Sequence, residues 1–228
     1  LNARITKKSF KKWSKILSFS KKIFNEFDLC LAQNDKTCNY LKILGAKNIR
    51  KIGNLKFSQS KLELKNKSNP RIKKFLINKK IMFSAISTHA GEELLCGKVH
   101  SNLKKKYKNI ISIIIPRHVH RAHEIKEELN SNGLKVHLHS SNRPMNKDTD
   151  IYLVDTFGET KAFLRLSKTA FMGKSIHAFG GQNPLEAARL GNRIIHGPNI
   201  ENFVEVYDFL KKHGDRKSTR LNSSHLLI

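Results

Sequence analysis

The fold is decided by the stretch IISIIIP at residues 110–116. Ser112 is its only polar residue, and the other five residues before the proline are isoleucine. A strand with one face in water alternates polar and apolar residues, whereas a strand of a parallel sheet is covered on both faces and is aliphatic throughout. The stretch therefore predicts an inner strand of a parallel sheet.

Further apolar stretches lie on both sides of this strand and alternate with stretches of helical periodicity. Strands are expected at residues 81–86, 110–115, 134–138, 150–154, 169–172 and 193–196. Helices are expected to end near residues 106, 130, 167 and 190, and a last helix to begin near residue 202. This alternation predicts an α/β fold with a doubly wound parallel sheet, which binds ligands outside the carboxyl ends of its strands.

The first part of the chain has a smaller pattern of its own. Strands are expected at 28–33 and 49–52, and a helix at 36–44 that Gly45 ends. A polar, lysine-rich stretch at 58–70 follows and predicts a linker between two domains.

Residues 6–27 carry apolar side chains at every third or fourth position, with lysines between them. The apolar positions are Phe10, Trp13, Ile16, Leu17, Phe19, Ile23, Phe24 and Phe27. This spacing is typical of an amphipathic helix. Such a helix either packs on its own domain or lies on an anionic lipid surface, and the sequence leaves both interpretations open.

The chain has 228 residues and a formal net charge of +26, because 44 lysine and arginine residues outnumber 18 acidic ones. Such a charge is typical of proteins that bind phosphate-rich partners, either nucleic acid or an anionic membrane surface. Most of the basic residues are lysine, whereas base recognition favours arginine. AT-rich codons favour lysine, isoleucine and asparagine together, so a third interpretation is that the charge reflects genome composition and the lysines are solvated. Three cysteines without CxxC spacing exclude a disulfide scaffold.

Polar and glycine-rich clusters follow several of the expected strands, at the edge of the sheet where ligands bind. The candidate binding residues in these clusters are Ser87, Thr88, His89, Glu92, Pro116, Arg117, His118, Thr156, Phe157, Gly158, Glu159, Gly180, Gly181, Asn183, Pro184, Leu185 and Glu186. Several clusters at one edge indicate a binding site more strongly than any one of them alone.

The clusters offer groups that suit an anion and a sugar. Arg117 can bind a phosphate or carboxylate with two hydrogen bonds, and the helix start after Gly158 presents backbone N–H groups. Thr156 and Glu159 also fit a plain capping box. His118 lies near His120 and His123, but these histidines lack zinc spacing and no metal site is expected.

Residues 180–186 combine helix capping with a feature that capping leaves unexplained. Asn183 fits an N-cap, Pro184 the first helical position, and Glu186 the third. Capping does not explain Gly180 and Gly181, which suit a backbone that approaches a ligand closely. A carboxylate at Glu186 can accept bonds from two ribose hydroxyls.

Together these motifs resemble the bacterial 3-deoxy-D-manno-octulosonic acid (Kdo) transferases. The resemblance lies in residues 1–4, 32–34, 53–57, 87–93, 116–118, 155–159, 180–186, 197–198 and 202–203, in the same order. It covers about residues 1–214. Departures from the family pattern are Phe157 in place of Met, Lys174 in place of Gly, and Gln182 in place of His.

The resemblance implies a GT-B fold of two Rossmann-like domains. Residues 1–58 are then the remnant of a truncated N-terminal, acceptor-side domain, and residues 59–214 bind CMP-Kdo. Residues 215–228 look like translated sequencing adapter and are expected to be a non-native tail. The catalytic carboxylate is expected in the missing N-terminal part, so no catalytic residue is assigned and the chain alone is expected to lack transferase activity.

The implied reaction is an inverting, metal-independent transfer of Kdo from CMP-Kdo to the lipid A precursor, without a cofactor, at the cytoplasmic face of the inner membrane. Pro116, Arg117, residues 157–159 and residues 183–186 would contact the CMP part of the donor. The alternatives are another GT-B nucleotide-sugar enzyme, either a glycosyltransferase or an epimerase, and a basic nucleic-acid-binding module. The last is disfavoured because the sequence has no helix-turn-helix, zinc-finger or RNP-type motif.

Overall fold

The structure is a computed structural model that describes residues 2–53, 80–212 and 219–220. The chain divides into two units, Leu1–Lys65 and Asn66–Ile228. The linker expected at 58–70 and the domain boundary at residue 58 lie outside the described residues, as does most of the tail expected at 215–228. These three expectations stay predictions.

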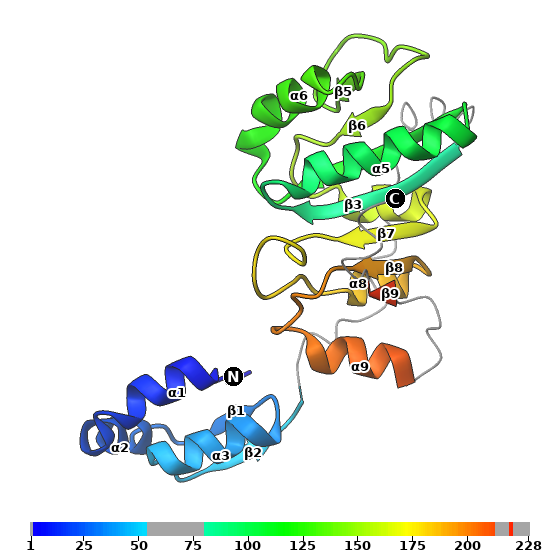
Figure 1. The fold of residues 1–228 in the computed structure, drawn as a ribbon. Coiled ribbons are helices and arrows are strands. Elements are labelled where there is room, and N and C mark those ends of the chain that lie inside the picture. Colours follow the sequence, from blue (N-terminus) through cyan, green and yellow to red (C-terminus); the bar gives the residue numbers. More distant parts are fainter. Residues whose placement is uncertain (1, 54–79, 213–218, 221–228) are drawn as a thin grey trace. The chain divides into compact units, whose positions relative to one another are not determined.

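Within residues 2–53, the first unit has a small parallel sheet with three helices (Figure 1). Its elements are α1 (Lys7–Ser14), α2 (Leu17–Asn25), β1 (Cys30–Ala32), α3 (Asp35–Leu44) and β2 (Ile49–Lys51). Strands β1 and β2 pair in parallel, with α3 as the connection between them, and Leu41 and Leu44 of α3 are buried. Helix α3 ends at Gly45 as expected, at a φ of 103°. A Cβ there would lie 2.7 Å from Lys21 Cα, so both the backbone angle and the packing require glycine.

The basic stretch at 6–27 forms two helices, so the expectation of one continuous helix is wrong. The Ser20 hydroxyl donates to the carbonyls of Trp13 (2.7 Å) and Ile16 (3.0 Å), at the break between α1 and α2. Phe10 stacks on Tyr40 of α3 at 4.0 Å between ring centroids. The stretch thus packs partly on its own unit. It also leaves large apolar side chains exposed: Ile16, Phe19 and Phe27.

The second unit carries a larger parallel sheet, flanked by helices. Its elements are β3 (Lys80–Thr88), α5 (Glu92–Lys106), β4 (Ile110–Pro116), η3 (Val119–Arg121), α6 (Ala122–Ser131), β5 (Val136–Leu138), β6 (Ile151–Leu153), α7 (Thr160–Leu166), β7 (Thr169–Met172), α8 (Leu185–Arg189), β8 (Arg193–His196), α9 (Val204–Lys212) and β9 (Thr219–Arg220). The strand order is β5-β6-β4-β3-β7-β8-β9, and every pairing is parallel. This confirms the doubly wound α/β sheet.

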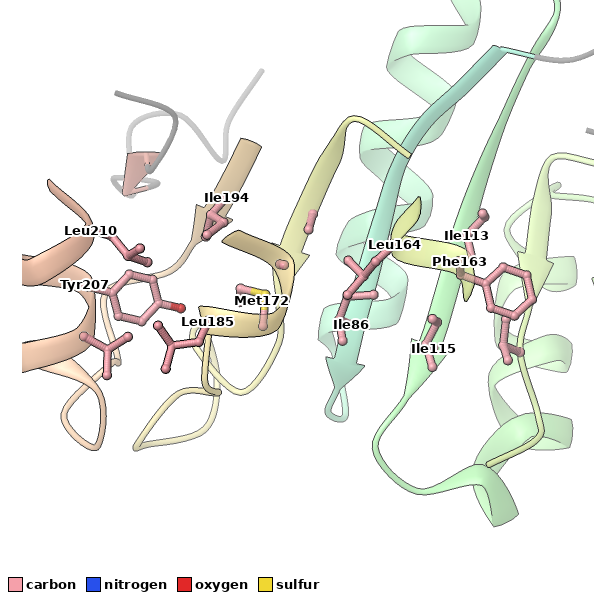
Figure 2. Packing of buried hydrophobic residues seen from close by; sticks show 14 of the residues in the cluster. Ile86, Ile113, Ile115, Phe163, Leu164, Met172, Leu185, Ile194, Tyr207 and Leu210 are labelled. Atoms are coloured by element: carbon pink, nitrogen blue, oxygen red, sulfur yellow. The ribbon is translucent and has the colours of Figure 1, made fainter. Parts of the chain in front are cut away.

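The two faces of the sheet are covered by different helices, and alternate residues of each strand point to opposite faces. Ile113 and Ile115 of β4 join a cluster with Phe163 of α7, Leu185 of α8 and Tyr207 of α9 (Figure 2). The opposite face holds a second cluster, built by residues of β3, β4, β6 and β7 with Cys96 of α5 and Ala122, Ile125 and Leu129 of α6. Burial on both faces explains the near-continuous isoleucine of β4.

Ser112, the one polar residue of that stretch, is fully buried and belongs to a polar network. Its hydroxyl lies 2.9 Å from His100 Nδ1, and His100 Nε2 lies 3.4 Å from Asp150 Oδ1. Asp150 also contacts Lys104 Nζ and accepts the backbone N–H of Lys135 at 3.0 Å. The serine therefore satisfies a buried histidine at the amino end of the sheet.

The order in which the chain adds strands to the sheet reverses between β3 and β7, and we call this place the reversal point. From β3 the chain adds β4, then β5 at the edge of the sheet, and then β6 between β4 and β5. It returns through α7 to β7, which pairs with the other side of β3. The helices that follow these two strands, α5 and α8, cover opposite faces of the sheet. Doubly wound sheets bind ligands at the carboxyl ends of the strands where this change of face occurs. No helix of the described ranges is long and apolar enough to span a bilayer.

Candidate functional site

Glu92 joins the loops that follow the two strands at the reversal point. Its side chain is fully buried at the start of α5. Oε2 accepts the backbone N–H groups of His89 (2.9 Å) and Lys174 (2.8 Å), and Oε1 accepts those of Ser175 (2.9 Å) and Ile176 (3.1 Å). Bonds to an ionised carboxylate are among the stronger hydrogen bonds of proteins. Glu92 therefore fixes the shape of this edge from within, whereas its role as a donor-contacting residue stays a prediction.

The loop after β7 has a backbone that needs such support. Lys174 has a φ of 57°, a left-handed conformation that costs an L-residue about 1–2 kcal/mol. The neighbouring Gly173 is packed so closely that a Cβ would lie 2.4 Å from the carbonyl oxygen of Ser87. Ser87 itself has a φ of 53°. The bonds to Glu92 hold this segment in place.

Gly180 and Gly181 are required by the chain's own packing. Both have positive φ, 107° and 66°. A Cβ on Gly181 would lie 2.9 Å from the carbonyl oxygen of Asn199 and 3.0 Å from Ile200 Cα. The Gly181 N–H donates to the Lys174 carbonyl at 3.0 Å, which connects this turn to the segment that Glu92 holds. The positive φ accounts for Gly180, and the positive φ together with these contacts accounts for Gly181, without a ligand.

Helix α8 begins one residue later than the sequence predicts. Pro184 is the N-cap residue, and Asn183 Oδ1 accepts the backbone N–H of Leu185 at 3.1 Å. The Asn183 side chain thus caps the start of the helix as expected, and Pro184 has helical backbone angles, whereas the helix itself begins at Leu185, one residue later than predicted. Glu186 lies in the first turn, its side chain 45% exposed, with Oε1 3.5 Å from Lys161 Nζ. Its carboxylate is accessible to a ligand.

Cationic groups gather where β3 and β4 end. The Arg117 N–H donates to the Thr88 carbonyl at 3.0 Å, and the side chains of Arg117 and His118 are exposed. His89 meets the His118 ring edge-on at 5.6 Å, and His89 Nε2 is buried with no hydrogen-bond partner among the described residues. Burial lowers the pKa of His89, and the positive charges of Lys174 and Arg117 lower it further. This group of residues suits an anion.

Glu159 anchors the third cluster, after β6. It is the N-cap residue of α7, so the expected capping box with Thr156 as N-cap is wrong. Glu159 Oε2 accepts the Thr156 hydroxyl and lies 2.7 Å from His139 Nε2. Gly158 has a φ of 87°, and the Phe157 side chain is 78% exposed. His139, which follows β5, is absent from the sequence-based candidates, and its position just after an expected strand is the signal that could have identified it.

The candidate residues after β3, β4, β6 and β7 all follow the carboxyl ends of parallel strands, as the sequence predicts. Thr88, Glu92, Pro116 and Leu185 are buried, whereas Arg117, His118, Phe157 and Gly158 are exposed. The described part of the chain holds no group of three or more His, Cys, Asp or Glu side chains arranged for a metal ion.

A doubly wound parallel sheet with polar clusters at the carboxyl ends of its strands defines the class of Rossmann-like domains. A solved structure described as the C-terminal CMP-Kdo binding domain of WaaA from Acinetobacter baumannii matches with a TM-score of 0.61 and 26% identity, over 69% of this chain and 80% of that one. The fold is therefore a Rossmann-like parallel sheet of the GT-B glycosyltransferase type, like that domain.

The sequence comparisons name the family. A family model described as 3-Deoxy-D-manno-octulosonic-acid transferase (kdotransferase) matches residues 1–59. The 3-deoxy-D-manno-octulosonic acid transferase of Rickettsia felis is 33% identical over 206 residues, which are 90% of this chain and 44% of that protein. The protein of the same name from Haemophilus influenzae is 26% identical over 211 residues, 92% of this chain and 49% of that one. Over about nine tenths of its length the chain is thus similar to 3-deoxy-D-manno-octulosonic acid transferases, and it spans about half the length of the curated relatives it matches.

Proposed function

We propose that the second unit binds CMP-Kdo and that the chain contributes this donor-binding part to the transfer of Kdo to a lipid A precursor. The observation that carries the proposal is the loop arrangement at the reversal point, where one buried carboxylate, Glu92, ties together the loops after β3 and β7. The likeness to a solved domain described as CMP-Kdo binding supports the same ligand.

The residues at this edge suit the parts of the donor. Arg117 is exposed beside His118 and is proposed to bind the phosphate. Glu186 is half-exposed in the first turn of α8 and is proposed to accept hydroxyl groups of the ribose. The backbone of residues 157–159 is proposed to line the nucleotide, since Gly158 leaves room for a close approach.

The reaction proposed for the complete enzyme is inverting and metal-independent. A carboxylate acts as general base on the acceptor hydroxyl. The acceptor oxygen forms a bond to the anomeric carbon of Kdo while the bond from that carbon to the phosphate oxygen breaks, and CMP leaves with the electron pair. No described residue is assigned as the base.

The acceptor side is proposed to act at the cytoplasmic face of an anionic membrane. Lysines of α1 and α2 lie in the same stretch as the exposed side chains of Ile16, Phe19 and Phe27. Basic residues beside exposed apolar ones favour binding to anionic lipid headgroups. The lysines of the first part of the chain are assigned to this surface rather than to nucleic acid.

Ligand-induced thermal stabilisation of the chain tests the donor proposal. A ligand that binds only the folded state raises the Tm by an amount that increases with the ratio of its free concentration to its Kd. CMP should raise it and UDP should not. Arg117→Ala should remove the CMP shift, whereas Arg193→Ala, an exposed arginine at the amino end of β8, should keep it. Equal shifts with UDP, or none with CMP, would contradict the proposal.

A further inference from the structure

His139 links a buried tyrosine to the carboxylate of Glu159. Its Nδ1 lies 2.7 Å from the Tyr152 hydroxyl, and its Nε2 lies 2.7 Å from Glu159 Oε2. The imidazole is only 11% exposed, and it meets the ring of Phe163 edge-on at 5.4 Å. Both ring nitrogens are therefore engaged, and the orientation of the ring is fixed by packing.

The hydrogen-bond pattern sets the tautomer of this histidine. Burial, together with the charges of Glu159 and Asp155, raises the pKa of Tyr152 to about 12. The phenol therefore keeps its proton at neutral pH. An ionised carboxylate only accepts hydrogen bonds, so the proton of a neutral His139 imidazole is on Nε2, which donates to Glu159. Nδ1 is then the acceptor, and the Tyr152 hydroxyl donates to it. The direction of donation runs from Tyr152 through His139 to Glu159.

Both interactions of the carboxylate with neighbouring side chains fall on the same oxygen. Oε2 receives the His139 ring and the Thr156 hydroxyl. The Glu159 side chain nevertheless keeps 33% of its surface exposed. The carboxylate is thus held on one side by the protein and reachable from the other, at the carboxyl edge of the sheet.

We propose that His139 is a positioning residue that orients the Glu159 carboxylate toward a hydrogen-bond donor of the bound nucleotide, either a ribose hydroxyl or a base amino group. The inference rests on the proposed function, because it takes the nucleotide site to be at this edge. Without the imidazole, the Glu159 side chain has to be ordered by the ligand itself, which weakens binding.

Calorimetric titration of the full chain with CMP tests this role. His139→Phe keeps an aromatic ring but removes both ring nitrogens, and loss of one charge-assisted bond corresponds to about tenfold weaker binding of CMP. His139→Gln offers an N–H donor and a carbonyl acceptor, and should recover most of the affinity. A merely structural role would not produce this recovery.

His137 provides the matched control. It lies on β5, two residues before His139, and its ring stacks on Tyr152 with 5.7 Å between ring centroids. His137→Phe should lower the Tm about as much as His139→Phe while leaving the affinity for CMP unchanged. If His139→Phe does not fold, Tyr152→Phe removes only the hydroxyl and should weaken CMP binding by a factor of about two to five.

A further ligand, 2′-deoxy-CMP, distinguishes the donor groups. If Glu159 accepts the ribose 2′-hydroxyl, binding of 2′-deoxy-CMP should lose most of its sensitivity to His139→Phe. If Glu159 accepts the base amino group, binding of 2′-deoxy-CMP should keep that sensitivity. Equal binding of CMP by the wild type and His139→Phe, or equal weakening by His137→Phe, would overturn the inference alone. No binding of CMP by the wild type would overturn the proposed function and the inference together.

Discussion

The carboxylate of Glu92 accepts the backbone N–H of Lys174 at 2.8 Å, across 82 residues of sequence. The same carboxylate holds His89, Ser175 and Ile176 through their backbone N–H groups. One buried side chain thus joins the loop that precedes α5 to the loop that precedes α8. Because these loops flank the reversal of strand order, the shape of the candidate donor site depends on this carboxylate.

Glu92→Gln should disrupt both loops, because an amide NH₂ group then faces backbone N–H donors. We expect a loss of about 2–3 kcal/mol in the free energy of unfolding and at least tenfold weaker CMP binding. Glu93→Gln is the control, since Glu93 is equally buried but contacts Arg121 at 3.2 Å. It should destabilise the protein and leave CMP affinity intact. Equal effects on affinity would contradict this assignment.

Gly181→Ala should destabilise the protein more than Gly191→Ala does. Both glycines have positive φ, 66° and 77°, so both substitutions carry the cost of a left-handed L-residue, about 1–2 kcal/mol. Only at Gly181 would the new Cβ also meet backbone atoms, 2.9 and 3.0 Å away, whereas nothing lies within 4 Å at Gly191. Urea unfolding measures the difference, and equal losses would show that the close packing of residues 199–200 is unimportant.

Asp150→Asn should lower stability at neutral pH by about 1–3 kcal/mol. Burial alone would raise the pKa of Asp150. The pKa nevertheless lies below its ordinary value of 3.8, because Lys104 and the backbone N–H of Lys135 donate hydrogen bonds to the carboxylate. A group with a lowered pKa stabilises the fold above the unfolded-state pKa and loses this effect as the pH falls through the folded-state pKa.

The stability difference between wild type and Asp150→Asn should therefore be constant from pH 7 to pH 5 and shrink below about pH 3.8. Urea unfolding at a series of pH values measures it. A difference that grows on acidification would mean that the Asp150 carboxylate is not held in its charged form.

The sequence predicts the strands well because their apolar runs report burial directly. Residues 110–115 and 169–172 lie where β4 and β7 are found. The break at residues 15–16 was not predicted, because a period of three to four fits one helix or two. The packing of Phe10 on Tyr40 and the bonds from Ser20 decide between them.

The sequence predicts which residues lie at the candidate site, but it does not predict the hydrogen bonds that join them. Arg117 and Glu159 are recognisable because polar residues follow expected strands. The bonds of Glu92 to residues 174–176, and of His139 to Glu159, join segments far apart in sequence, and no local pattern encodes such contacts. Helix α8 begins at Leu185, one residue after the predicted start at Pro184, and the Asn183 side chain accepts the N–H of Leu185.

Titration of the isotope-labelled chain with CMP, followed by amide chemical shifts, tests the central claim most directly. We predict that the amides of Gly158, Lys174 and Gly181, which lie in the loops after β6 and β7, shift with a common affinity. Amides at the opposite edge, such as those of Asn109 and Asn192, should not. Shifts confined to the opposite edge, or no shifts at saturating CMP, would contradict a nucleotide site at the carboxyl ends of this sheet.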